Sequence, residues 1–181
     1  MKKKLLLHTC CGPCSTHCVK ELMQDYDVVM FFYNPNIHPG GEFVRRFEEA
    51  RKVSGELGIP LVEGAYSPHD WLDMIKGLEE EPEGGRRCGV CFGMRIAETA
   101  RYAKLNGFDA FTTTMTISPH KDSGQINEIG EKLARKHGIE WVHSDFKKKD
   151  GFRKSAQMSE EMGLYRQNYC GCFYSVRSGD Q

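Results

Sequence analysis

Residues 5–15 read Leu-Leu-Leu-His-Thr-Cys-Cys-Gly-Pro-Cys-Ser, and this stretch begins an alternation of strand and helix that continues along the chain. The apolar run at residues 5–9 predicts a short buried strand, and residues 15–23 predict the helix that follows it. Cysteine, glycine and proline occupy the turn between these two elements. A strand, a tight turn and a helix in this order indicate the first unit of an α/β domain.

The alternation of strands and helices continues along the chain. Short apolar runs predict further strands at residues 28–33, 61–62, 108–113 and 140–142. Helical periodicity predicts helices at residues 42–57, 88–103, 123–137 and 150–162, and another that opens at Ser67. Residues 79–87 and 114–122 are predicted loops. The pattern predicts a single α/β domain over residues 1–181, built on a doubly wound, mainly parallel five-stranded sheet.

Thiol and imidazole side chains lie at or after the ends of these predicted strands. His8, Cys10 and Cys11 lie at the end of the first strand. His38 follows the second strand, and His120 follows the fourth. Ligands of doubly wound sheets bind beyond the carboxyl ends of the strands, where the strand order reverses. We therefore expect a site at this edge that is lined by cysteine and histidine.

The composition of the chain limits the binding partners and the cellular compartment that we expect. The chain has 25 Lys and Arg against 25 Asp and Glu, so a nucleic-acid partner would have to be met by a local basic patch. The apolar run after Met1 and three lysines is only three leucines, whereas a secretory signal needs roughly seven to fifteen apolar residues. No run approaches the ~20 apolar residues of a membrane span. We expect a cytoplasmic protein without a membrane partner.

Eight cysteines are the most informative feature of the composition. They are Cys10, Cys11, Cys14, Cys18, Cys88, Cys91, Cys170 and Cys172. A disulfide framework is typical of small secreted domains, but this chain is long enough to fold without one and its cysteines are tightly grouped. The grouping favours metal binding or redox chemistry in a reducing compartment. Cys18, on the inner side of the first helix, is expected to be structural.

The spacing of the cysteines favours an iron–sulfur site over zinc. Thiols at a helix N-terminus are more readily ionised, and thiolates are the ligands that both kinds of site need. A zinc ribbon places its two C-x-x-C pairs within roughly twenty residues, whereas Cys11 and Cys88 are 77 positions apart. Two alternatives stay open: a thioredoxin-like dithiol at Cys11 and Cys14, and a structural zinc-binding module.

Several long motifs make the chain similar to a known family. They are residues 5–15, residues 32–39 (Phe-Tyr-Asn-Pro-Asn-Ile-His-Pro), residues 111–114 with residues 118–121 (Ser-Pro-His-Lys), residues 165–172 (Tyr-Arg-Gln-Asn-Tyr-Cys-Gly-Cys), and Arg87-Cys88 with Cys91. With these motifs the chain resembles the cobalamin-independent epoxyqueuosine reductases of the QueH family over residues 5–175. Its layout is also similar to PP-loop/HUP-type nucleotide-binding domains, although their phosphate loop is replaced here by the cysteine turn, so we expect no use of ATP.

The resemblance implies an oxidoreductase of tRNA processing. It would carry out the last step of queuosine biosynthesis, in which the epoxide of epoxyqueuosine in tRNA is reduced to an alkene and water leaves. The implied cofactor is a [4Fe-4S] cluster, and an additional mononuclear iron is considered beside it. The implied partners are a tRNA whose anticodon loop carries epoxyqueuosine and an electron donor protein.

Residue roles follow from the resemblance as hypotheses. The expected metal ligands are Cys10, Cys11, Cys88 and Cys91. The expected catalytic residues are Cys14, Cys170, Cys172 and His8, of which the three cysteines form either a second metal site or a redox-active pair at the C-terminal tail. The expected substrate-binding residues are Tyr33, Asn34, His38, Ser118, His120 and Arg166. Candidate phosphate contacts are Arg45, Arg46, Arg86, Arg87, Lys147, Lys148, Lys149 and Arg166.

Overall fold

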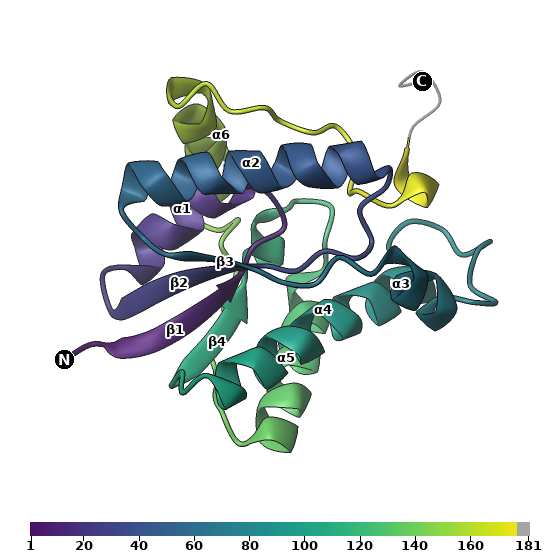
Figure 1. Ribbon diagram of the computed structural model, residues 1–181, viewed down its shortest axis with the longest axis horizontal. Helices are drawn as coiled ribbons and strands as arrows, with labels where there is room; N and C mark the ends of the chain where they lie inside the picture. The colour runs from purple at the N-terminus through teal and green to yellow at the C-terminus, as the bar shows by residue number, and fades with distance from the viewer. Residues whose placement is uncertain (177–181) are drawn as a thin grey trace.

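A computed structural model of the chain describes residues 1–176 and contains one five-stranded parallel sheet (Figure 1). The strands are β1 (Lys3–His8), β2 (Tyr26–Phe32), β3 (Leu61–Glu63), β4 (Ala110–Thr113) and β5 (Glu140–Trp141). Their order is β3-β2-β1-β4-β5, and every neighbouring pair is parallel. The predicted doubly wound α/β fold is confirmed, and the strand order reverses between β1 and β4.

Helices cover both faces of the sheet (Figure 1). On one face lie α1 (Gly12–Leu22), α2 (Gly40–Leu57) and α6 (Gly151–Glu161), and on the other lie α4 (Arg86–Leu105) and α5 (Ser123–His137). The remaining helices are α3 (Pro68–Met74) and the 3-10 turns η1 (Thr114–Ile117) and η2 (Phe173–Ser175). Within residues 1–176, no helix combines the length and the apolar character that a membrane span requires.

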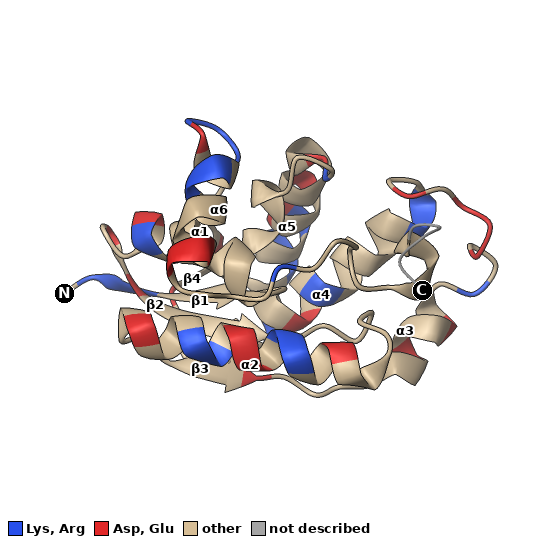
Figure 2. Ribbon diagram, turned by 90° about the horizontal axis from the view of Figure 1, so that it is seen from above, with Lys and Arg blue, Asp and Glu red and all other residues tan. Residues whose placement is uncertain are grey.

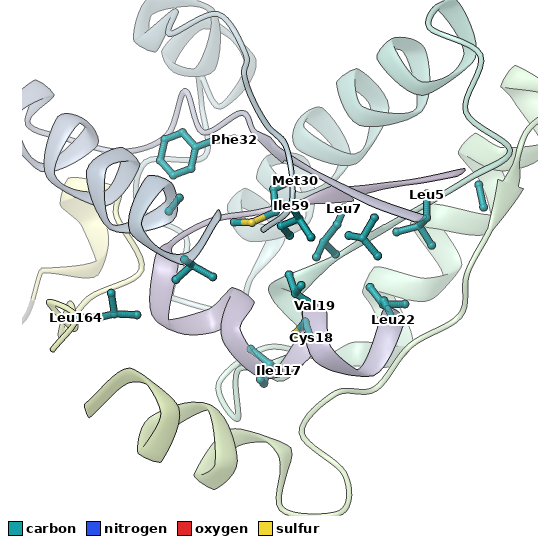
Figure 3. Close-up of a cluster of buried hydrophobic side chains, with 14 of the residues drawn as sticks. Leu5, Leu7, Cys18, Val19, Leu22, Met30, Phe32, Ile59, Ile117 and Leu164 are labelled. Carbon is teal, nitrogen blue, oxygen red and sulfur yellow. The ribbon is translucent and has the colours of Figure 1, made fainter. Parts of the chain in front are cut away.

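The alternation of side chains along β1 divides the core into two layers. Leu5 and Leu7 pack with Val19 beneath α1 and α2, and Cys18 belongs to the same fully buried layer (Figure 3). Leu6 points to the opposite face, where it packs under α4 and α5. A strand buried on both faces reads as a continuous apolar run, which is why the first strand is visible in the sequence.

Several element boundaries differ from the prediction by a few residues, and three of these differences lie near the cysteines or the end of β4. Helix α1 begins at Gly12 because Cys11 is its N-cap and accepts a hydrogen bond from the Cys14 backbone N–H at 3.4 Å. Helix α4 begins at Arg86, inside the predicted loop. Residues 114–117 form a 3-10 turn instead of a loop, because the Thr113 hydroxyl accepts the Met115 backbone N–H. The helix predicted at residues 123–137 is confirmed in full.

Candidate metal centre and main pocket

The turn between β1 and α1 brings three thiols together. The Sγ atoms of Cys10, Cys11 and Cys14, the first cysteine group, all lie within 4.8 Å of one another. The Cys10 backbone N–H donates to the Thr114 hydroxyl at 3.4 Å, which ties the turn to the end of β4. The Gln167 amide donates to Cys11 Sγ at 3.0 Å. The group therefore lies at the switch point between β1 and β4, where such folds bind ligands.

Glycine at position 12 is needed for this arrangement. A β-carbon on Gly12 would lie 2.6 Å from the carbonyl oxygen of Glu49 in α2. Helices α1 and α2 can approach this closely only because position 12 carries no side chain. The helix start that holds Cys11 and Cys14 is thereby fixed against the rest of the fold.

Ionisation of the first cysteine group is uneven. Hydrogen bonds from the thiols of Cys11 and Cys14, with the nearby charge of Lys121, lower the pKa of Cys10. Burial raises the pKa of Cys11 to about 12. Without a bound cation, the group therefore favours a single thiolate, at Cys10, which accepts hydrogen bonds from the two neighbouring thiols. A bound divalent metal would displace the remaining protons, as thiolate sites require.

A second cysteine group lies beside the first turns of α4. Cys88 and Cys91 come from α4, while Cys170 and Cys172 come from the segment that follows α6. All four line one small pocket, called the apolar pocket, and the ring of Trp71 lines it as well. This pairing of segments about 80 positions apart is a tertiary feature, since nothing in the local sequence joins them.

Arg46 and the chain around His38 hold the C-terminal segment in place. The Arg46 guanidinium donates to the carbonyl oxygens of Cys170 at 2.9 Å and Tyr169 at 3.1 Å, and it pairs with Glu42 at 2.6 Å. The Tyr169 hydroxyl donates to the His38 carbonyl at 2.6 Å. The Arg46 side chain is buried and these hydrogen bonds are partly buried, so they hold the second cysteine group in position.

Arg95 lies between the two cysteine groups. Its side chain is 1% exposed and lines both the apolar pocket and the larger cavity beside it. Its Nε donates to the Cys91 carbonyl at 3.2 Å, but Nη2 has no hydrogen-bond partner among residues 1–176. A buried cation without a partner is costly, and anionic thiolates or a thiolate-bound metal centre would offset that cost. The residues present therefore fit such a centre.

The first cysteine group opens into a cavity of about 210 Å³, the main pocket. Its lining includes Cys10, Cys14, Lys121 and Cys170. Burial opposes the charged form of Lys121, yet electrostatic attraction to the nearby cysteines, Cys170, Cys10 and Cys14, raises its pKa well above the usual value. A protonated amine therefore faces the thiols across a cavity large enough for part of a small molecule.

The predicted site residues divide into three sets. The main pocket is lined by Cys10, Cys14, Cys170, Ser118, His120 and Arg166, and the apolar pocket by Cys88, Cys91, Cys170 and Cys172. The expected ligands Cys10, Cys11, Cys88 and Cys91 are not brought into one tight group in the part of the chain that is described. Instead, Cys10 and Cys11 join Cys14, while Cys88 and Cys91 join the C-terminal cysteines.

The third set is His8, Tyr33, Asn34 and His38, which line neither pocket. His8 is fully buried; its Nε2 donates to the Tyr33 carbonyl at 3.0 Å and its Nδ1 accepts from the Thr113 hydroxyl at 2.9 Å. Burial lowers the pKa of His8 to about 4. The Asn34 amide donates to the Thr9 carbonyl at 2.9 Å. These contacts give His8 and Asn34 a role in joining the sheet's strand ends.

Two of the candidate phosphate contacts serve the fold instead. Arg46 clamps the C-terminal segment, and Arg87 is 3% exposed and donates to the carbonyl oxygens of Leu78 and Glu79. Both side chains are almost fully buried and donate to backbone carbonyls, so neither presents its guanidinium at the surface to a phosphate. Lys148 and Lys149 are exposed on the loop that leads into α6, a segment coloured mainly as Lys and Arg in Figure 2, whereas Lys147 donates to the Lys121 carbonyl at 2.8 Å.

Sequence reasoning missed three residues of the site. Lys121 belongs to the Ser-Pro-His-Lys motif at residues 118–121, and its position after the fourth strand is a usable signal. Gln167 lies inside the motif at residues 165–172, but its residue type alone indicates no role. Arg95 gave no signal, because a single arginine on a helix is usually exposed and only the packing shows that it is buried.

The fold and the site define an α/β domain with a group of three cysteines at its switch point that could hold a metal ion. The sequence profile of the family described as Epoxyqueuosine reductase QueH matches residues 5–178. The chain belongs to the QueH family of epoxyqueuosine reductases, which are oxidoreductases.

Individual relatives agree with this membership. The chain is 41% identical over 183 residues to the epoxyqueuosine reductase QueH of Streptococcus pyogenes serotype M1, covering 98% of this chain and 72% of the relative. It is 33% identical over 175 residues to the Thermotoga maritima QueH, covering 95% and 90%. Among solved structures, a predicted subunit of a tRNA methyltransferase from Methanocaldococcus jannaschii has a TM-score of 0.52 at 12% identity, covering 89% of this chain and 75% of the other, which shows a shared fold.

Proposed function

We propose that this chain reduces epoxyqueuosine in tRNA to queuosine with an iron–sulfur cluster and a neighbouring single iron. The observation that carries the proposal is the pair of cysteine groups that flank the buried guanidinium of Arg95, whose Nη2 lacks a hydrogen-bond partner among residues 1–176. Two separate thiol sets of different geometry suit two different metal centres. Reduction of an epoxide also needs two functions, a source of electrons and a group that activates the oxygen.

The two cysteine groups suit different metals. Three ligands placed about 2.3 Å from a tetrahedral metal lie roughly 4 Å apart and leave one position open. The first cysteine group, with its sulfurs within 4.8 Å, meets this requirement and faces the main pocket. The four thiols of the second cysteine group match the ligand count of a [4Fe-4S] cluster. This assignment replaces the ligand set Cys10, Cys11, Cys88 and Cys91 expected from the sequence.

When bound, these centres would supply single electrons and a Lewis acid for the epoxide oxygen. The chain's own residues do the rest. Lys121 holds a proton at Nζ beside the thiols and can deliver it to the departing oxygen. Arg95 balances the negative charge of both groups, and Gln167 orients Cys11. Two electrons and two protons enter, both carbon–oxygen bonds of the epoxide break, and water leaves.

The proposal extends to substrate, partners and place. The substrate is a tRNA whose anticodon loop carries epoxyqueuosine, and the electrons come from a donor protein. The chain acts in the cytoplasm as a single α/β domain over residues 1–181, with the C-terminal cysteine-bearing tail completing the site; of that range, residues 177–181 lie outside the described part. Ser118, His120 and Arg166 line the main pocket and contact the substrate in this proposal.

Metal analysis of protein purified without oxygen tests this function. We expect about four sulfides per chain and more iron than sulfide, with reduction of epoxyqueuosine in tRNA. Cys172→Ser should remove the sulfide, and Cys14→Ser should remove the extra iron and leave the sulfide in place. Cys18→Ala is the matched control, because Cys18 is buried outside both groups and its loss should leave both metals bound. Zinc without sulfide would overturn the proposal in favour of a structural zinc module.

A further inference from the structure

The ring of Phe152 lies at the rim of the main pocket and is 40% exposed. It belongs to the first turn of α6. The guanidinium carbon of Arg166 lies 5.6 Å from the ring centroid. Among residues 1–176, no other aromatic ring stacks on Phe152. A large apolar ring is therefore presented to the pocket without an aromatic partner.

Phe173 shows that exposure alone does not explain this position. Phe173 is 44% exposed, but its ring packs against Tyr174 at 4.3 Å, His38 at 5.1 Å and Trp71 at 6.1 Å between centroids. Its exposed part is the edge of an aromatic cluster. Phe152 has no such cluster, so the fold gives no packing reason for an aromatic residue there.

The backbone before Phe152 is held in an unusual conformation. Lys149 and Asp150, with φ of 51° and 61°, are the non-glycine residues that adopt the left-handed region within residues 1–176. A β-carbon on Gly151 would overlap the carbonyl oxygen of Phe146. A non-glycine residue in the left-handed region carries backbone strain. Such strained residues persist where the surrounding structure holds them in place, and they cluster at binding and active sites. The turn places Phe152 at the start of α6, facing the pocket.

Arg166 completes a fixed platform with the ring. Its Nη1 donates to the Ser159 hydroxyl at 3.2 Å, and Ser159 is fully buried in α6. Cys10 and Cys14 line the same pocket and are less exposed than Phe152 and Arg166. The pocket thus has an aromatic and cationic rim and a thiol-lined floor.

We propose that Phe152, backed by Arg166, is a stacking site for the base of the nucleoside being reduced. The inference rests on the proposed function and names how the substrate is held. Bases taken out of an RNA loop are gripped by stacking on aromatic side chains and arginine. With the base ring on Phe152, its epoxide-bearing substituent extends inward toward Cys10 and Cys14. The rim then selects the base, and the floor carries out the chemistry.

Three substitutions at one position test the stacking. Phe152→Ala should raise KM for tRNA carrying epoxyqueuosine about tenfold, within the range for losing one base–aromatic contact, and change kcat at saturating tRNA far less. Phe152→Tyr keeps the ring and should restore KM, whereas Phe152→Leu should not. The affinity of Phe152→Ala for this tRNA should fall. The dependence of that affinity on salt concentration should not change, because no phosphate contact is removed. Leu105→Ala, an exposed site on α4, is the control and should behave as wild type.

Defined outcomes would overturn the inference. A wild-type KM for Phe152→Ala, or equal rescue by Leu and Tyr, would show that aromatic stacking is not used. A reduced salt slope would assign the loss to backbone contacts by the nearby lysines instead. If the wild-type protein binds this tRNA and does not reduce it, the proposed function fails, and the affinities of the same variants for that tRNA still decide whether Phe152 stacks a base.

Discussion

The two cysteine groups are built in opposite ways. The first cysteine group comes from five consecutive residues, and its geometry follows from a strand, a helix cap and the absence of a side chain at Gly12. The second cysteine group joins α4 to a segment about 80 positions further along, and the buried clamp of Arg46 fixes that segment. One group is a local motif and the other is a product of packing, so different substitutions should disrupt each of them.

The surroundings of the two groups also differ. The first group faces the main pocket, which holds Lys121 and the exposed ring of Phe152. The second group lies in the apolar pocket beside Trp71. This difference suits one metal centre that contacts the substrate and another that is shielded from water. Shielding matters for the second centre because burial and hydrogen bonding set the reduction potential of a cluster. Arg95 and Cys170 are among the residues that line both pockets.

Arg46→Leu should break the second cysteine group and spare the first. The substitution leaves the carboxylate of Glu42 and the carbonyl oxygens of Tyr169 and Cys170 buried without their donor. Removing one partner of a buried ion pair costs about 3 to 5 kcal/mol. Urea unfolding should show this loss, and the purified variant should lack sulfide but retain the single iron.

Arg51→Leu on the same helix is the matched control for Arg46. Arg51 pairs with Glu48 at 2.9 Å, but both side chains are at least half exposed. Surface pairs of this kind contribute little, so the stability and the sulfide content should stay at wild-type values. Equal loss of both metals in Arg46→Leu would show that the clamp supports the whole site.

His8→Gln should change the pH dependence of stability beside the first cysteine group. Burial lowers the pKa of His8 from 6.5 to about 4, so the folded state favours the neutral ring. Its contribution is complete above pH 6.5 and is lost as the pH falls toward 4, which amounts to about 3 kcal/mol. The difference in unfolding free energy between wild type and variant should therefore shrink from pH 7.5 to pH 4.5. Parallel curves would contradict this role.

Arg95→Met should affect both cysteine groups together. Replacing a buried cation that lacks a full set of hydrogen bonds by an apolar side chain of similar length should stabilise the metal-free protein by about 2 kcal/mol. The same change removes the shared counter-charge, so iron should bind more weakly to both groups. Chelator titration measures the iron affinities. Arg95→Lys keeps the positive charge, so its iron affinity should fall less than that of Arg95→Met. Weakened binding in one group alone would show that Arg95 serves that group only.

Gly12→Ala and Gly93→Ala should shift stability in opposite directions. The added methyl group at position 12 meets the Glu49 carbonyl at 2.6 Å and should cost about 1 to 2 kcal/mol through separation of α1 and α2. Position 93, in the helix that carries the second cysteine group, has no heavy atom within 4 Å of such a methyl group. Alanine there should stabilise by about 0.5 to 1 kcal/mol. Thermal unfolding of both variants provides the measurement.

Much of the fold was predictable because its signals are local. The helix at residues 123–137 has the N-cap Asp122 and the left-handed Gly138 at its ends, and both are visible in the sequence. The strands of a parallel sheet are buried on both faces, so their apolar runs stand out. The long motifs shared with the QueH family predicted the membership that the family profile confirms.

The candidate site was predictable only in part. The sequence identified seven of the cysteines as chemically important, yet it grouped Cys88 and Cys91 with Cys10 and Cys11 because all four lie near helix starts. It also placed His8 at the reaction, which stays a prediction; the structure adds that both ring nitrogens of His8 make hydrogen bonds at the strand ends. These differences arise because residue type and spacing carry no information about which distant segment covers a pocket.

The sequence by itself determined the alternating elements, the parallel sheet and the thiol turn at the end of β1, since these depend on contacts between near neighbours in the chain. Only the tertiary structure decided that the C-terminal cysteines join α4, that Arg95 is buried between the two groups, and that Phe152 is presented to the main pocket. Those features depend on contacts between segments far apart in the chain, and such contacts form only when the whole domain packs.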